Sequence, residues 1–496
     1  MIIEIHGNIK PYYVQTLAMI FFPGVRFPEN EPETESTLKA VVTVAENGGG
    51  VSSNVKISGN GKDSSANASH PVSDFDGDLE LAVKAVCGEA FIRAGEQYTG
   101  ITPPWGILTG VRPAKVATDL IDRGFVPADV SKKLQMEYLV SPSKADMAAR
   151  VAAAEKRIIT DDARKECSVY IGIPFCPSRC AYCSFVSYTS PKLLALIPDY
   201  LEVLKEDICR LADLISRLGM AVKTVYIGGG TPTVLDERQL ESLLECVSGT
   251  GWRPEEFTLE AGRPDTITIA KLSTAFEHGI TRVSVNPQSL NDDVLKAIGR
   301  RHDSKMFYEA YSIAEKSGIR DINVDLIAGL PGDTEDSFRS TLDSVIALRP
   351  TNITVHTFSV KKSSEFRQEG RYDAGSATAS ASVEYSQETL PSRGYLPYYM
   401  YRQKNTVGNL ENVGYALPGH EGLYNIYMME EVHSIFAAGA SSVTKLVSLP
   451  DEEGNERIER LFQPKYPYEY LDEWREGEKQ KRTDSLRKTA FEFFGG

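Results

Sequence analysis

Three cysteines lie close together in the stretch IPFCPSRCAYCSF. Cys176, Cys180 and Cys183 have the spacing of one face of a helix, so one interpretation is three small buried residues on a core helix. Pro174 and Pro177 argue against that helix, because an interior proline removes a hydrogen-bond donor and clashes with the preceding turn. A loop with three thiols is instead typical of a site for a soft metal centre.

The number of thiols distinguishes between kinds of metal centre. A structural zinc site takes four ligands. The next cysteine, Cys167, starts the preceding strand-like run, ~20 Å away at ~3.3 Å per residue, and is a poor fourth ligand. A four-iron cluster normally takes one thiolate for each iron. Three thiolates therefore leave one iron open to a small molecule that chelates through amine and carboxylate groups.

Other polar residues and glycines follow the strand-like runs farther along the chain. In chain order they are Gly228, Gly229, Gly230, Thr231 and Pro232 after TVYI, Glu260 after FTL, Gln288 after RVSVNP, Asp325 within NVDLIAG, and His356 to Ser359. In a parallel β/α barrel the reactive groups lie at the carboxyl ends of the strands, so we expect these residues on one rim. Each also has a structural alternative, such as a tight glycine turn or an ion pair at a strand end.

Strand-like and helix-like runs alternate from about residue 167. The strand-like runs are SVYIGIP, TVYIGG, FTLEAG, RVSVNP, NVDLIAG and NITVHTF. Six units are too few for a closed eight-unit barrel, which takes ~250 residues, so we predict an α/β fold with a partial, open (β/α)6 TIM-like barrel. The predicted domains are an N-terminal α+β domain of unknown role over 1–163, the barrel over 164–392, and a C-terminal α/β extension over 393–496.

The sequence of the N-terminal domain contains patterns typical of individual strands, turns and helices. LKAVVTVAE and VSSNVKIS read as two strands around the turn NGGG, and a long helix is expected over about 78–97. The polar stretch GNGKDSSANASHPVSD is expected to be a loop.

The charge balance is acidic. The 496 residues carry a formal net charge of −14, which argues against a nucleic-acid-binding protein. No signal peptide is visible and the longest apolar run near the N-terminus is far short of the ~20 residues of a membrane helix, so we expect no membrane span and a cytoplasmic location. Seven cysteines in so long a chain indicate a reducing compartment. Cys87, Cys209 and Cys246 stand alone in apolar helix-like patterns, and we interpret them as core residues.

The cysteine and glycine motifs together resemble those of the radical S-adenosylmethionine enzymes. More narrowly, YIGIPFCPSRCAYCSF, GGGTPT, LEAGRPD, RVSVNPQSLNDDVLKAIGRRH and DLIAGLPGDT resemble the oxygen-independent coproporphyrinogen III oxidase/dehydrogenase family. The extra N-terminal part and PYYMYRQKNTVGNLENVGYALPG make the full chain look most like the HemZ-type branch. The resemblance covers about 164–445 and implies a radical SAM barrel followed by a HemN-like C-terminal domain.

The resemblance also implies cofactors and their ligands. Cys176, Cys180 and Cys183 would bind a [4Fe-4S] cluster, and S-adenosyl-L-methionine would chelate its open iron, with a second molecule held nearby in some members. The residues that would line one of these sites are Tyr182, Gly230, Thr231, Gln288, Arg300 and Asp325. Those that would line the other are Tyr170, Gly229, Glu260, Ser359 and Val443, of which Tyr170 and Glu260 are the candidate catalytic residues.

The implied reaction is the oxygen-independent oxidative decarboxylation of coproporphyrinogen III. A 5′-deoxyadenosyl radical takes hydrogen from a propionate side chain, and loss of carbon dioxide and one electron leaves a vinyl group. Two rounds give protoporphyrinogen IX, a step of haem biosynthesis. The implied partners are this tetrapyrrole and an electron donor such as flavodoxin or ferredoxin. Lys361, Lys362, Arg402 and Lys404 are candidates for binding the propionates.

Departures from the family pattern leave other functions open. Gly172 and Phe185 stand where the best-studied branch has a histidine and a further cysteine, and CSF resembles the haem-chaperone relatives, which are thought to insert haem. Those relatives typically carry an HNxxYW-like motif that GHEGLYNIYMMEEVHSIF does not reproduce, so we favour the enzyme. His420 and His433 are weaker candidates for haem ligands. A radical SAM enzyme that acts on another tetrapyrrole is a third hypothesis.

Overall fold

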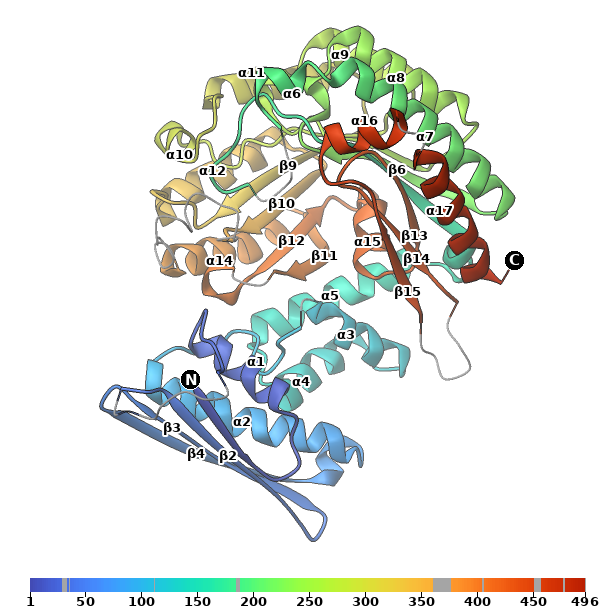
Figure 1. Ribbon diagram of the computed structural model, residues 1–496. Coiled ribbons are helices and arrows are strands. Elements are labelled where there is room, and N and C mark those ends of the chain that lie inside the picture. The colour runs from blue at the N-terminus through green and yellow to red at the C-terminus, as the bar shows by residue number, and fades with distance from the viewer. Residues whose placement is uncertain are drawn as a thin grey trace. The chain divides into compact units, whose positions relative to one another are not determined.

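A computed structural model describes residues 1–28, 34, 36–110, 112–183, 188–359, 376–403, 406–449, 456–475 and 478–495. The chain divides into two compact units, residues 1–153 with 401–405 and residues 154–400 with 406–496 (Figure 1). The domain borders that we predict from the sequence stay predictions.

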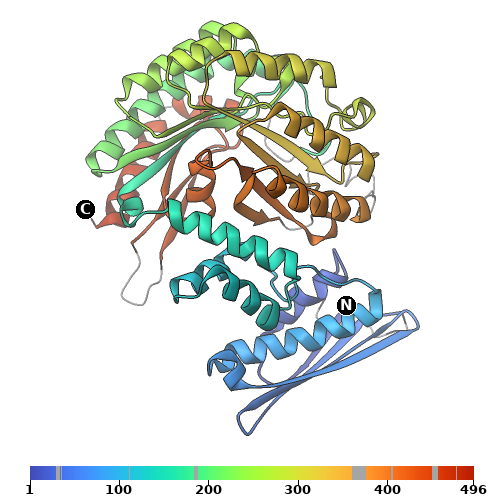
Figure 2. The same cartoon turned by 180° about the vertical axis from the view of Figure 1, so that it is seen from behind.

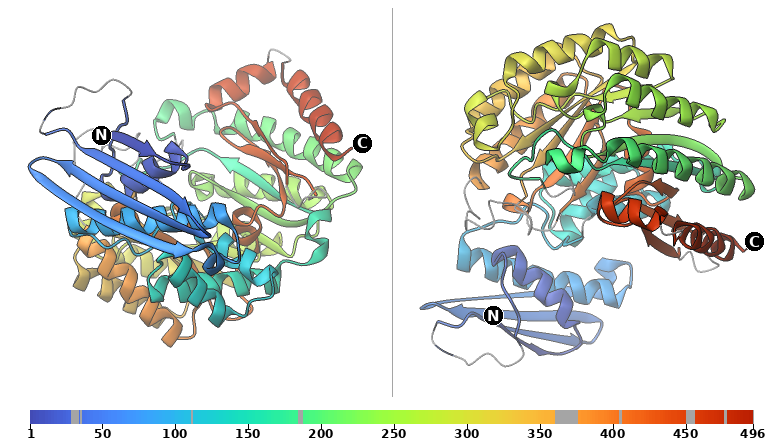
Figure 3. Two further views of the ribbon diagram at one scale, coloured as in Figure 1. Left: turned by 90° about the horizontal axis from the view of Figure 1, so that it is seen from below. Right: turned by 45° about the horizontal axis from the view of Figure 1, so that its top comes forward.

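The first unit contains a four-stranded sheet in the order β1-β2-β3-β4. Its strands are β1 (Ile2–His6), β2 (Lys39–Asn47), β3 (Gly50–Gly59) and β4 (Lys62–Pro71), and its helices are α1 (Pro11–Phe21), α2 (Leu79–Thr99), α3 (Pro113–Asp122) and α4 (Pro127–Tyr138), with α5 (Pro142–Ile158) leading into the second unit. Figure 3 shows α1 and α2 together on one face of the sheet. Buried apolar side chains, among them Val42, Val55 and Phe91, fill the core of this unit.

The hairpin expected around NGGG is confirmed. Asn47 pairs with Gly50 across β2 and β3. Gly48 and Gly49 between them have φ angles of 54° and 95°, the left-handed values that a tight two-residue hairpin turn needs. The expected long helix is also confirmed as α2.

The polar stretch that we expected to be a loop is strand β4. Ten residue pairs join it to β3, and its inward positions carry the buried small residues Ser64, Ala66 and Ala68. Ser64 donates from Oγ to the carbonyl oxygen of Ala94 on α2 at 2.8 Å. The stretch lacks an apolar pattern because small side chains are what fit beneath a closely packed helix.

The second unit is built on one eleven-stranded sheet in the order β11-β12-β10-β9-β8-β7-β6-β5-β13-β14-β15. Its strands are β5 (Glu166–Ile173), β6 (Ala221–Gly229), β7 (Glu256–Leu259), β8 (Arg282–Ser284), β9 (Asp321–Ala328), β10 (Asn352–Thr357), β11 (Leu396–Arg402), β12 (Glu411–Ala416), β13 (Ser434–Ala438), β14 (Val443–Val447) and β15 (Ile458–Phe462). Strands β5 to β10 lie side by side in chain order and pair parallel throughout. The predicted partial, open (β/α)6 arrangement is therefore confirmed, because the strand order is linear and does not close on itself.

Strands from the C-terminal part extend both edges of the six parallel strands. β13 pairs parallel with β5, whereas β12 pairs antiparallel with β10. The C-terminal part therefore continues the barrel sheet instead of forming a separate one.

The helices of the second unit follow the strands of the barrel and, in the C-terminal part, strands β12 and β15. They are α6 (Pro191–Leu194), α7 (Ile197–Arg217), α8 (Glu237–Gly249), α9 (Ile269–Glu277), α10 (Asp292–Ala297), α11 (Ser304–Lys316), α12 (Glu335–Leu348), α14 (Ser376–Ser392), α15 (Leu423–Met429), α16 (Pro467–Arg475) and α17 (Glu478–Phe494). Figure 2 shows the helices from α7 to α12 along the outer side of the sheet. Among the described residues, none of the helices is both long enough and apolar enough to cross a membrane. The cytoplasmic location stays a prediction.

Candidate active site at the ends of the parallel strands

The three clustered cysteines lie in an irregular loop at the carboxyl end of β5. Residues 174–183 contain a single turn and no helix, so the alternative of a core helix is wrong. The amide of Cys183 donates to the carbonyl oxygen of Cys180 at 3.1 Å. The amide of Cys176 donates to the carbonyl oxygen of Tyr188, also at 3.1 Å. Cys176 and Cys180 are buried, Cys183 is half-buried, and none of the three is in a disulfide. Main-chain hydrogen bonds thus hold the three thiols on an irregular loop.

Arg263 holds the cysteine loop in place. Its guanidinium binds both carboxylate oxygens of Asp265 at 2.9 Å. Nη1 also donates to the carbonyl oxygen and the Oγ of Ser178, at 3.2 and 2.6 Å, and lies 4.0 Å from the Sγ of Cys180. Arg263 thus binds the loop between Cys176 and Cys183 through the main chain and the side chain of Ser178. Arg263 was not among the predicted site residues, although the motif LEAGRPD places it three residues after the strand-end residue Glu260.

Tyr182 and Arg300 are brought together by the structure. The Tyr182 hydroxyl accepts hydrogen bonds from Nη2 and Nε of Arg300 at 2.9 and 3.3 Å. Nη1 of the same guanidinium donates to the carbonyl oxygen of Asn286 at 3.2 Å. Burial raises the pKa of Tyr182, so its hydroxyl stays protonated. The pair ties the end of the cysteine loop to the segments that follow β8.

The glycine turn after β6 packs directly on the cysteine loop. The amides of Gly230 and Thr231 donate to the carbonyl oxygens of Ile173 and Phe175, both at 2.8 Å. A Cβ at Gly230 would lie 2.4 Å from the carbonyl oxygen of Phe175, so only glycine fits. Thr231 places its Oγ1 3.3 Å from the Sγ of Cys176. The glycines therefore allow a close approach between the turn and the loop that carries the thiols.

Glu260 lies at the carboxyl end of β7 against a column of tyrosines. Its carboxyl group accepts hydrogen bonds from the Tyr226 hydroxyl and the Gly229 amide. The rings of Tyr170 and Tyr226 stack with centroids 6.1 Å apart, and those of Tyr226 and Tyr424 with centroids 4.7 Å apart. Burial, followed by the charge of Asp325, raises the pKa of Glu260 to about 7.

Tyr226 and Tyr424 were not among the predicted site residues. A signal for Tyr226 is present in the sequence, since β5 and β6 both read VYIG and the structure pairs Tyr170 with Tyr226 in register. No comparable signal marks Tyr424.

Asp325 on β9 lies beside Gln288, which is on the segment that follows β8. Asp325 accepts from Nδ2 of Asn323 at 2.7 Å, and its Oδ2 lies 3.6 Å from Nε2 of His356. The amide of Gln288 donates to the carbonyl oxygen of Asp325 at 3.1 Å, and Gln288 has a φ of 71°. The side chain of Gln288 is 7% exposed, and its Oε1 has no hydrogen-bond partner among the described residues. A buried acceptor of this kind fits an amine or hydroxyl donor of a bound molecule.

Ser359 and Val443 both lie near the carboxyl ends of the parallel strands, but on opposite sides of the barrel sheet. Ser359 follows β10 and forms a bridge with Thr406. Val443 begins β14, which runs antiparallel to β13, so this residue lies at the end of the sheet where β5 and β13 finish. Their roles in ligand binding stay predictions.

Most of the basic residues proposed to bind the propionates cannot be placed in the site. Lys361, Lys362 and Lys404 lie outside the described residues. Arg402 belongs to the first unit, where its guanidinium donates to the carbonyl oxygen of Leu108 and lies over the ring of Trp105.

The cysteine loop has the donor set for an iron–sulfur cluster. It offers three thiols on an irregular segment. The buried guanidinium of Arg263 lies beside Cys180, and among the described residues the Oε1 of Gln288 has no partner on the same rim. Within the described ranges, no three side chains of His, Cys, Asp or Glu are grouped so as to hold a single metal ion. The chemistry of the donors fits one thiolate for each of three irons.

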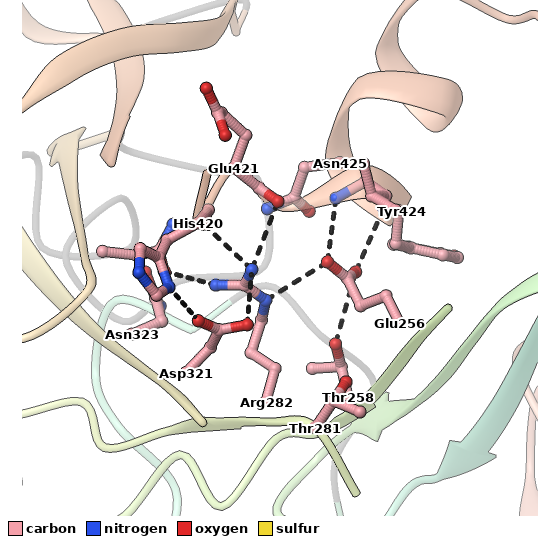
Figure 4. A network of polar contacts seen from close by, with 12 residues as sticks. Glu256, Thr258, Thr281, Arg282, Asp321, Asn323, His420, Glu421, Tyr424 and Asn425 are labelled. Carbon is pink, nitrogen blue, oxygen red and sulfur yellow. Dashed lines mark hydrogen bonds and ion pairs between the residues drawn. The ribbon is translucent and has the colours of Figure 1, made fainter. Parts of the chain in front are cut away.

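A buried polar network lies at the opposite ends of the strands. Glu256, Arg282 and Asp321 are the first residues of β7, β8 and β9 (Figure 4). Asn352, the first residue of β10, belongs to the same network. Arg282 donates to Glu256 and Asp321 at 3.2 and 3.4 Å and also contacts the side chain of Asn352. Nδ1 of His420 lies 2.5 Å from Oδ1 of Asp321. The site and this network therefore occupy different ends of the same strands.

The second candidate haem ligand is also engaged in packing. His433 is fully buried, with Nδ1 3.0 Å from the Oγ of Ser168. Its ring stacks on Tyr427 with centroids 3.8 Å apart.

Comparisons with known proteins agree with the arrangement of the site. The profile of the radical SAM superfamily matches residues 170–345. Over 397 residues the chain is 37% identical to the oxygen-independent coproporphyrinogen-III oxidase-like protein HemZ of Bacillus subtilis, with 78% of each chain covered.

Two further relatives extend the comparison. The chain is 30% identical over 286 residues to the heme chaperone HemW of Bacillus subtilis, which covers 55% of this chain and 70% of HemW. The solved structure of coproporphyrinogen III oxidase (HemN) from Escherichia coli, a radical SAM enzyme, matches with a TM-score of 0.47 and 23% identity. That match covers 57% of this chain and 66%, just under two thirds, of HemN.

Replacing Arg263 should loosen the cysteine loop. We expect Arg263→Gln to lower the free energy of unfolding by about 3 kcal/mol, because Asp265 loses its buried partner. In the metal-free reduced protein, Cys180 should also react faster with iodoacetamide, because a loop that is no longer held through Ser178 exposes this buried thiol. Arg253→Gln is the matched control, since Arg253 is exposed and donates only to the neighbouring Trp252 carbonyl. Urea unfolding and alkylation rates equal to those of the control would contradict this role.

A methyl group at Gly230 should separate the glycine turn from the cysteine loop. We expect Gly230→Ala to destabilise the protein by about 2 kcal/mol through overpacking and to lower the iron content after reconstitution. Gly249→Ala makes the same chemical change where no atom lies within 4 Å, and should alter stability by less than about 1 kcal/mol. Iron content and thermal unfolding are measured for both variants. Equal values for the two would show that the turn tolerates a side chain.

The raised pKa of Glu260 should give stability a pH dependence. Between pH 4.5 and about 7 the folded protein binds a proton that the unfolded chain has released, so the free energy of unfolding falls as pH rises through this window. Glu260→Gln removes that loss. In urea unfolding at pH 5 and pH 8, we expect the variant to gain stability over the wild type at the higher pH, by up to about 3 kcal/mol. A difference that does not change with pH would show that Glu260 titrates normally.

Proposed function

The chain belongs to the radical SAM family of oxygen-independent coproporphyrinogen-III oxidase-like proteins that includes HemZ, and from this premise we propose that it converts coproporphyrinogen III to protoporphyrinogen IX. The observation that carries the proposal is the 37% identity to HemZ over 78% of both chains. The three-thiol loop and its glycine turn, packed together at one rim, are consistent with it.

Proteins of this family use a [4Fe-4S] cluster and S-adenosylmethionine. When bound, these cofactors supply a carbon-centred radical that removes a hydrogen atom from the substrate. In the proposal Cys176, Cys180 and Cys183 hold the cluster. Arg263 fixes the loop through the side chain of Ser178 and lies beside the Sγ of Cys180.

The remaining rim residues are proposed to bind and orient S-adenosylmethionine. Gln288 offers an unsatisfied acceptor, and the ionised carboxylate of Asp325 accepts hydrogen bonds from hydroxyl or amine groups. Although burial favours its neutral form, the contacts of Asp325 with His356, Asn323 and Thr354 lower its pKa. Asp325 therefore stays charged at neutral pH.

Glu260 and Tyr170 are proposed to act next to the reacting groups. Because its pKa lies at about 7, Glu260 can hold or release a proton at physiological pH. Burial and the charge of Glu260 raise the pKa of Tyr170, so Tyr170 remains a neutral hydroxyl donor. Stacking on Tyr226 restricts its ring to one orientation.

A haem-insertion function is the second candidate, because HemW is 30% identical to this chain. In the described structure His420 and His433 are both engaged, the first with Asp321 and the second with Ser168 and Tyr427. Binding of haem through either residue would require these contacts to break. The enzyme is therefore the proposal that needs no rearrangement of the core.

The test is an anaerobic turnover assay with the full chain. After reconstitution with iron and sulfide, the protein is incubated with coproporphyrinogen III, S-adenosylmethionine and dithionite. We expect protoporphyrinogen IX, methionine and 5′-deoxyadenosine. Cys180→Ser should abolish all three products, whereas Cys209→Ser, an equal change at an exposed thiol far along the chain from the loop, should retain them.

Other outcomes would select the alternatives. Tight haem binding without porphyrinogen turnover would replace the proposal with haem insertion. Turnover of a different tetrapyrrole would keep the radical chemistry and replace the substrate. A flavodoxin or ferredoxin as the electron donor would be tested by replacing dithionite with either reduced protein.

A further inference from the structure

Two cysteines outside the cluster loop, Cys209 and Cys246, do not behave as core residues. The sequence pattern predicts that both are lone core residues, and this prediction is wrong. Cys209 on α7 is exposed and Cys246 on α8 is half-buried. Nothing in the proposed function uses either thiol.

Contacts between α7 and α8 bring these two thiols close to each other. Nζ of Lys205 donates to the Oγ of Ser242 at 3.1 Å. The two helices run in the same direction, because α7 follows β5, α8 follows β6, and these strands pair parallel. Cys209 and Cys246 each stand one helical turn beyond this contact, so their positions are in register. The Sγ of Cys246 lies 3.6 Å from the carbonyl oxygen of Lys205.

The direction in which helical side chains point brings the Cys209 thiol toward the Cys246 thiol. In an α-helix the side chain of residue i lies over the turn before it, so the Cys209 side chain lies over Lys205. The Sγ of Cys246 already contacts that turn. Accordingly, the two thiols are within side-chain hydrogen-bonding reach of each other.

We propose that Cys209 and Cys246 form a redox-active dithiol that a small-molecule disulfide converts to an intramolecular disulfide. Cys209 is the accessible member and reacts first, and Cys246 is the resolving member. The proposal is independent of the proposed function, since it concerns neither the cluster nor the substrate.

The chemistry balances as two successive thiol–disulfide exchanges. The thiolate of Cys209 attacks the small disulfide, so that one S–S bond forms as another breaks and one small thiol leaves. Cys246 then loses its proton and attacks the sulfur of Cys209, which releases the second small thiol. One small disulfide is reduced to two thiols, and two protein thiols are oxidised to one disulfide.

The second exchange should be slow and pH-dependent. Burial, followed by the proximity of Cys209, raises the pKa of Cys246 to about 12. Little of Cys246 is therefore thiolate at neutral pH, and the rate of cross-linking should rise about tenfold for each pH unit. A slow second step suits a site that responds to sustained oxidation.

The disulfide would connect the two helices that follow the site motifs. α7 follows the cysteine loop after β5, and α8 follows the glycine turn after β6. Oxidation would thus fix these two helices to each other on the outer side of the strands that carry the site.

The experiment uses the full chain, reconstituted with its cluster and kept anaerobic. It is incubated with oxidised glutathione at pH 7 and pH 8.5, blocked with iodoacetamide, digested without reduction and analysed by mass spectrometry. We expect a peptide pair joined through Cys209 and Cys246, formed faster at pH 8.5 and lost on addition of dithiothreitol. Cys209→Ser should not form the pair, and Cys246→Ser should carry glutathione on Cys209.

Two results would overturn the proposal. One is wild-type protein in which Cys209 carries glutathione but no joined pair appears at either pH, which would show that the thiols do not meet. The other is wild-type protein in which both thiols are alkylated to completion after oxidation. The two variants also serve as folding controls, because their circular dichroism should match that of the wild type.

Discussion

The site depends on a main-chain contact beyond the ends of two neighbouring parallel strands. The register that pairs Ile173 with Gly229 continues past both strands through the amides of Gly230 and Thr231. Because a side chain at Gly230 would overlap the carbonyl group of Phe175, the two segments are in contact only when glycine is present. The cysteine loop and the glycine turn are therefore one structural element, although about fifty residues separate them in the sequence.

Charge divides the rim into two parts. Arg263 and Arg300 lie beside the loop that carries the thiols, whereas Glu260 and Asp325 lie on the neighbouring strand ends. The two carboxyl groups influence each other, and their surroundings shift their pKa values in opposite directions. Such a split gives one group that stays charged and one that exchanges protons near neutrality. This arrangement follows from burial and hydrogen bonding, not from residue type.

The sequence predicts the strand ends well because each barrel strand has a clear apolar run followed by glycine or polar residues. It also predicts which residue types gather at the rim. It does not predict partners that the fold brings together from distant segments, such as Tyr424 on Tyr226 or Cys246 beside Cys209. Strand β4 was missed for another reason, since Ser64 and its small neighbours carry no apolar signal and depend on the fit beneath α2.

The buried network at the amino ends of the strands also acts on the site at their carboxyl ends. The carboxylate of Glu256 accepts from the amides of Leu423 and Tyr424 at 2.8 and 3.1 Å and so fixes the start of α15. The ring of Tyr424 then stacks on Tyr226, whose hydroxyl donates to Glu260. Glu256, at the first position of β7, thereby positions Glu260, which follows the same strand. The contact runs through Tyr424 and Tyr226. The properties of Glu260 consequently depend on the C-terminal part of the chain as much as on the barrel.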